Sequence, residues 1–174
     1  MSEYRFNEIV PLDSGLLEEG VLLWIWYADK IPPHLGISVD GSYYSLKYNG
    51  KDQDMCVAQP LKVIRDRKIA TLLIDLDLPL TMLTVHAVFE MFDKAASNGA
   101  TCLDPIQKSL SISNANTVFD LLNKLQSENK IKAVHGINLP DSYLGIPAYG
   151  IDEIRSRLIK LENASLGKHI SSIG

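Results

Sequence analysis

His34 stands at the start of a segment that reads as a tight β-hairpin, and a histidine in that position is a candidate acid–base group. The Asp40-Gly41 pair fits a two-residue turn, in which both central residues need a positive φ. Side chains alternate along a strand, so we expect His34 and Ser45 on one face of the hairpin. A histidine held there can accept a proton if a nucleophile comes within reach.

Cys102 is the candidate nucleophile, because it directly precedes a predicted short helix. We expect that helix to begin near Pro105, with Asp104 as its N-cap. The positive end of a helix dipole favours a thiolate, whereas the Asp104 carboxylate opposes one. In this interpretation Cys102 attacks a carbonyl carbon, His34 takes the thiol proton and Ser45 holds the imidazole ring.

Both residues also have a purely structural interpretation. Cysteine is among the most buried residue types, so Cys102 is equally explained as a packing residue. His34 follows two prolines and can simply satisfy a backbone carbonyl. Lys47, expected opposite His34 in the hairpin, would lower the histidine pKa without orienting the ring. The sequence leaves these alternatives open.

Other catalytic motifs are absent from the chain. It contains no Rossmann fingerprint, P-loop, HExxH, GxSxG or paired CxxC motif. Its four histidines lie at no metal-ligand spacing from one another or from a cysteine. We therefore expect neither a metal nor a cofactor.

Composition and charge narrow the functional classes. The net charge of −4 and the pI near 5.5 argue against broad binding to nucleic acid or to anionic membranes. Two cysteines do not form a disulfide scaffold, and the first residues lack the pattern of a secretory signal. The longest apolar run, residues 21–28, is too short to span a bilayer. These features predict a cytoplasmic, reduced protein without a membrane segment.

Hydrophobic periodicity supplies the elements that must position His34 and Cys102. An apolar run predicts a buried strand over residues 21–27, and two further strands are expected over 61–64 and 69–76. The period then changes to 3.6, which predicts a helix ending near Asn98-Gly99 and another that begins at Thr117. Residues 137–150 read as an irregular aromatic connection before a last amphipathic helix. Strands followed by helices indicate an α+β fold.

With these landmarks the chain resembles the circularly permuted NlpC-like cysteine hydrolases and acyltransferases of the papain superfamily. An apolar strand precedes a His-x-Gly-Ile strand (His34, Gly36, Ile37), and the histidine precedes the cysteine, over roughly residues 18–112. The resemblance implies a papain-like core over residues 1–112, in which an antiparallel sheet packs against helices. Residues 113–174 then form a C-terminal helical extension packed on the same domain.

Two functions follow from this resemblance. The first is a cysteine-dependent hydrolase or acyltransferase, of the thiol protease type, that acts on an amide, peptide or ester bond of a peptide or acyl substrate. The second is a non-catalytic interaction module that keeps the fold with a degenerate site. In the second case residues 137–150, with Tyr143 and Tyr149, would form the surface for a protein partner or a homodimer.

Overall fold

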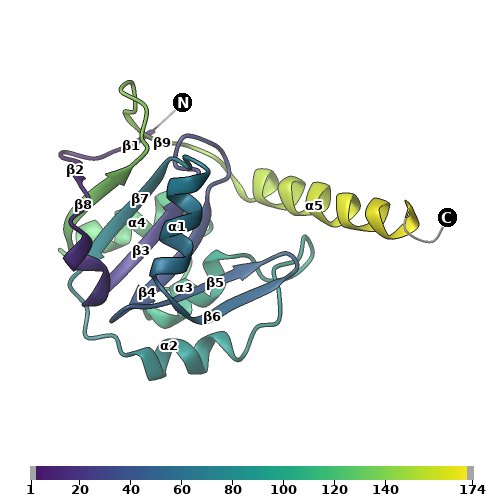
Figure 1. The fold of residues 1–174 in the computed structure, drawn as a ribbon, viewed down its shortest axis with the longest axis horizontal. Coiled ribbons are helices and arrows are strands. Elements are labelled where there is room, and N and C mark those ends of the chain that lie inside the picture. Colours follow the sequence, from purple (N-terminus) through teal and green to yellow (C-terminus); the bar gives the residue numbers. More distant parts are fainter. Residues whose placement is uncertain (1–2, 172–174) are drawn as a thin grey trace.

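The computed structural model describes residues 3–171 and shows one seven-stranded sheet with helices on both of its faces (Figure 1). The strand order is β2-β8-β7-β3-β4-β5-β6, and all neighbours run antiparallel except β2 and β8. The strands of this sheet are β2 (Val10–Pro11), β3 (Val21–Trp26), β4 (His34–Val39), β5 (Ser42–Lys47), β6 (Gly50–Cys56), β7 (Thr71–Leu76) and β8 (Ile131–Ile137). The expected α+β class is confirmed.

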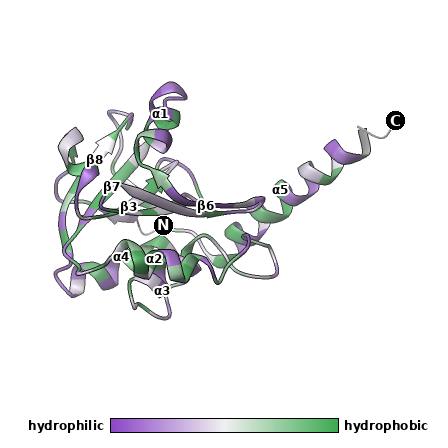
Figure 2. Ribbon diagram, turned by 60° about the horizontal axis from the view of Figure 1, so that its bottom comes forward, coloured by the Kyte–Doolittle hydropathy of each residue, from purple (hydrophilic) through white to green (hydrophobic). Residues whose placement is uncertain are grey.

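The sheet separates the core into two clusters, and helices cover each of them (Figure 2). The larger cluster lies between one face of the sheet and the helices α2 (Met82–Phe89), α3 (Leu103–Ser109) and α4 (Val118–Ser127). The smaller cluster lies on the other face, under η1 (Ser14–Glu18) and α1 (Ala58–Asp66). Strand β3 is apolar throughout because both of its faces are covered in this way.

The hairpin forms as the sequence predicts. Asp40 and Gly41 have φ values of 46° and 84°, which a two-residue turn of this type requires. Val39 lies opposite Ser42 as expected, but the pairing ends at Ile37 and Tyr44, so the expected pair of His34 and Lys47 does not form. Leu35 and Tyr44 face the larger core cluster, whereas Tyr43 packs in the smaller one. The face that carries His34 is therefore covered by protein as well.

Two predicted elements differ from the structure. Residues 61–64 belong to helix α1, because Val57, Leu61 and Ile64 recur at helical spacing and are buried in the smaller cluster. Helix α2 ends at Phe89, well before Asn98-Gly99. The chain after it runs along the end of β5, where the Ala95 N–H donates to the Lys47 carbonyl at 2.8 Å.

The region expected to be a helical extension also supplies strands. β8 lies inside the sheet between β7 and β2, and β9 (Gly145–Pro147) pairs with β1 (Glu3–Arg5) in a separate two-stranded sheet. Helix α4 has the predicted capping box between Thr117 and Asp120. Helix α5 (Ile151–Ser171) projects away from the body (Figure 1). Among residues 3–171, no helix is long and apolar enough to cross a membrane.

Candidate active site

The site forms where strands β4 and β5 separate. They pair only near the turn, up to Ile37 and Tyr44, and the rest of the hairpin has no β4–β5 pairs within the described residues 34–47. A cavity of about 620 Å³ occupies this region. Its walls come from both faces of the sheet, and they include Gln59 and Val63 of α1 as well as Cys102 and Leu103 of α3. The opening between the two strands thus joins the two sides of the sheet.

His34 is held by Ser45, as the expected shared face requires. The His34 Nε2 atom lies 2.8 Å from the Ser45 Oγ atom. Burial strongly raises the pKa of Tyr43 beside it, and the Ser45 side chain opposes this rise. A Cβ atom at Gly36 would lie 2.3 Å from the Tyr43 Oη atom, so only glycine leaves room for this hydroxyl. Ser45 therefore orients the imidazole ring, and Gly36 makes room for the Tyr43 side chain on the same face.

The environment of His34 keeps its ring neutral. Burial lowers the histidine pKa to about 4, against an ordinary value of 6.5. The Asp52 carboxylate acts to raise this pKa and the Lys47 ammonium acts to lower it. Lys47 and Asp52 are themselves bonded at 2.7 Å, so their effects on the ring oppose each other. At neutral pH the ring has one N–H donor and one acceptor nitrogen.

Cys102 occupies the N-cap position of α3, two residues earlier than the expected N-cap at Asp104. The helix begins early because Asp104 lies in its first turn and accepts the Thr101 backbone N–H at 2.6 Å. Burial raises the pKa of the Cys102 thiol to about 11, and the Asp104 charge adds to the rise. The backbone N–H groups of Leu35 and Cys102 act in the opposite direction. The resting sulfur is therefore a neutral thiol.

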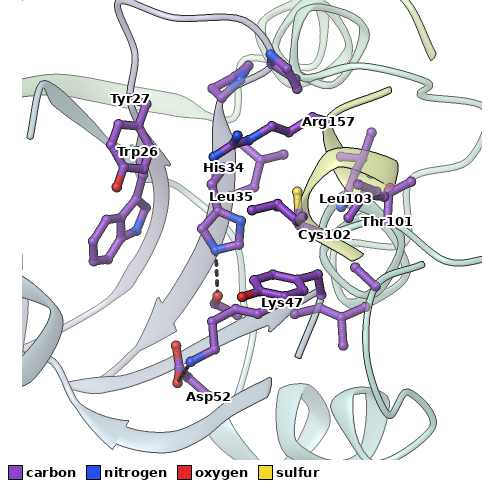
Figure 3. Close-up of a pocket in the computed structure, with 18 of the residues that line it drawn as sticks. Trp26, Tyr27, His34, Leu35, Lys47, Asp52, Thr101, Cys102, Leu103 and Arg157 are labelled. Carbon is purple, nitrogen blue, oxygen red and sulfur yellow. Dashed lines mark hydrogen bonds and ion pairs between the residues drawn. The ribbon is translucent and has the colours of Figure 1, made fainter. Parts of the chain in front are cut away.

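The structure brings Cys102 and His34 to the wall of the same cavity. The Leu35 backbone N–H acts to lower the pKa of Cys102, and Leu35 directly follows His34 in β4. Figure 3 shows both side chains at the cavity wall, with Cys102 on the α3 side and His34 at the start of the strand. The hydrogen bonds of the described residues include none between the ring and the sulfur. The roles of Cys102, His34 and Ser45 as catalytic residues stay predictions.

Helix α5 and the loop before it line one side of the cavity. Ile154, Leu158 and Leu161 line it from α5, and Tyr149 lines it from the loop. The Tyr149 hydroxyl accepts the Val118 N–H at 3.0 Å, which fixes this loop on α4. The contribution of α5 and this loop to the cavity wall was not expected. Sequence periodicity shows that a helix has an apolar face, but it does not show what that face covers. The predicted partner surface at residues 137–150 stays a prediction.

The described residues contain no group of three or more histidine, cysteine, aspartate or glutamate side chains arranged to hold a metal ion. Cys56, the second cysteine, is exposed in β6.

Tyr43 and Gly36 were missing from the predicted site. The His-x-Gly spacing and the tyrosine opposite Ser38 were the available signals.

Comparison of the chain with family models, with curated proteins and with solved structures finds no match.

Proposed function

We propose that this protein is a cysteine-dependent hydrolase or acyltransferase that acts on an amide, peptide or ester bond. One observation carries the proposal. A thiol at the start of α3 and an imidazole at the start of β4 line one cavity, and the imidazole is held through Nε2 by Ser45. A nucleophile, a base and a group that orients the base are the parts that acyl transfer needs.

The proposed reaction assigns each proton to an atom. With Nε2–H donating to Ser45, the Nδ1 atom of His34 is the acceptor. Cys102 Sγ bonds to the carbonyl carbon of the substrate while its proton moves to Nδ1, and the Cys102 backbone N–H donates to the developing oxyanion. His34 then returns the proton to the leaving group, and a thioester forms. Water or an acceptor nucleophile cleaves the thioester by the same proton route.

The pKa values support one order of these events. The thiol has a pKa of about 11 and the imidazole a pKa of about 4, so a resting thiolate–imidazolium pair is disfavoured. The proton therefore moves during attack rather than before it. This order makes His34 a general base in the strict sense, and the acylation rate depends directly on it.

The resemblance to the circularly permuted NlpC-like enzymes supports the same assignment and leads us to propose a papain-like arrangement of the core. The histidine lies on a strand before a hairpin, and the cysteine lies at the start of a later helix. One departure from the family pattern is Ser45, which stands where an acid or an amide usually orients the histidine.

The second candidate is an interaction module with a degenerate site. It is favoured by the raised thiol pKa and the lowered histidine pKa, because both reduce the reactivity of the resting pair. In this case the cavity binds a ligand without cleaving it. The two candidates differ in whether Cys102 becomes acylated.

The test is acylation of the protein by a panel of p-nitrophenyl esters of different chain length, followed by intact-mass and peptide mass spectrometry. We expect one acyl group on Cys102 and a rate at least 100-fold lower in His34→Ala, as for the loss of a general base. Cys56→Ser is the matched control, because Cys56 is exposed and has no role in the proposed reaction. This variant should be acylated at the same rate as the wild type. Acylation confined to Cys56, or equal rates in the wild type and His34→Ala, would favour the binding module.

A further inference from the structure

The charges that line the cavity differ in sign from those of the chain as a whole. The chain carries 21 acidic and 17 basic side chains. The charged side chains that line the cavity are Lys47, Asp52, Arg67 and Arg157. Lys47 and Asp52 neutralise each other at 2.7 Å, so the two arginines leave the cavity with a local positive charge. A concave site with one sign of charge concentrates ligands of the opposite sign.

Arg157 is available to such a ligand. It lies on α5, and Figure 3 shows its side chain reaching from that helix toward the His34 end of β4. Its neighbour one turn earlier, Glu153, accepts the Gly150 N–H at 2.8 Å and forms no ion pair with it among the described residues. The residue one turn later, Leu161, is apolar. Among the described residues Arg157 has no ion pair.

Arg67 is in a similar position at the end of α1. It is the C-cap residue of that helix, it is exposed, and it lines the cavity. The adjacent acid, Asp66, pairs with Lys62 instead. Arg67 also has no ion pair among residues 3–171. Two guanidinium groups from different helices thus face one cavity whose other lining is largely apolar.

We propose that Arg157, assisted by Arg67, binds an anionic group of the substrate, a carboxylate or a phosphate, while the apolar body of the substrate fills the cavity. A guanidinium matches the two oxygens of either anion with two parallel hydrogen bonds. The identification of this ligand as a substrate rests on the proposed acyl-transfer function. The arginines act in recognition and have no part in the proton transfer between Cys102 and His34.

The experiment measures binding in the Cys102→Ser variant, so that it does not depend on acyl transfer. Decanoate, decyl phosphate and decanol share an apolar chain and differ in the head group, and calorimetric titration gives each affinity. We expect both anions, or one of them, to bind more tightly than decanol. Arg157→Gln should weaken anion binding about tenfold and leave decanol unchanged. The better of the two anions identifies the group as carboxylate or phosphate.

Arg155→Gln is the matched control, because Arg155 is an exposed arginine on the same helix that does not line the cavity. It should bind all three ligands as the parent does, and Arg157→Lys should keep part of the anion preference. Equal losses in Arg155→Gln and Arg157→Gln, or anions that bind no better than decanol, would overturn the inference. Anion selectivity without acylation of Cys102 would instead retain the arginine site and refute the acyl-transfer function.

Discussion

The two halves of the β4–β5 hairpin use the same residue types for different purposes. Ser38 and Ser45 are both fully buried; in the turn half, Ser38 accepts the Trp24 indole N–H at 2.8 Å. In the open half, Ser45 lies on the same face but bonds to His34 beside the cavity. Pairing between the strands is present in the first half and absent in the second. The separation of two strands, rather than the choice of side chain, turns a packing serine into a site residue.

The largest effect that separates the two halves should come from protonation of His34. Burial holds the folded-state pKa near 4, whereas the unfolded chain takes up a proton as the pH falls through 6.5. The unfolded state therefore binds more protons between these values, and stability falls as the pH falls. We expect the free energy of unfolding to drop by about 3 kcal/mol from this group between pH 7 and pH 4. Urea unfolding at both values, in the wild type and in His34→Gln, measures it; an identical pH dependence in both proteins would contradict it.

The next largest effect is the loss of stability in Gly36→Ala, which tests whether Gly36 makes room for the Tyr43 hydroxyl. Gly36→Ala places a Cβ atom 2.3 Å from Tyr43 Oη in a region where the ring is enclosed. We expect a loss of about 2 kcal/mol, typical of overpacking. Gly99→Ala is the control, because its Cβ atom meets only Ala96 at an ordinary 3.5 Å and should change stability by less than about 0.5 kcal/mol. Chemical denaturation compares the two, and equal effects would show that Tyr43 moves freely.

The two serines allow the comparison to be made directly. Ser38→Ala leaves the buried Trp24 N–H without a partner and should cost about 1–2 kcal/mol of stability, with no change in Cys102 acylation. Ser45→Ala removes an equally buried hydroxyl and leaves His34 Nε2 without its partner, so it should cost a similar amount of stability. It should slow acylation roughly five- to tenfold, the value of one lost hydrogen bond to the base. Denaturation and acylation rates together test this, and the same ratio of effects in both variants would refute the distinction.

The smallest effects concern the charges beside the ring. Lys47→Met should raise the pKa of His34, and Asp52→Asn should lower it, because the first removes a cation and the second an anion. The imidazole resonances in NMR spectra recorded across the acidic range report both values. Shifts in the same direction would show that loss of the Lys47–Asp52 pair rearranges the open half instead.

Local patterns predicted the hairpin better than the cavity. The Asp40-Gly41 turn depends on two adjacent residues. The alternation of side chains along the strands, counted from that turn, places His34 with Ser45. The strand expected at residues 61–64 is wrong because a short apolar run does not distinguish a strand from a buried helix face. Asp104 was predicted as N-cap because Pro105 suits a first helical position, yet Thr101 and Asp104 bond to each other and start the helix earlier. The α5 wall needed tertiary contacts that no spacing shows.

The position of that wall in the chain has a consequence during synthesis. A chain emerges from the ribosome from its N-terminus, so His34 and Cys102 are made well before the residues of α5 that line the cavity. Until Ile154, Leu158 and Leu161 have emerged, the cavity lacks the side that α5 supplies. The nascent protein thus has both side chains before it has the helix that lines their cavity.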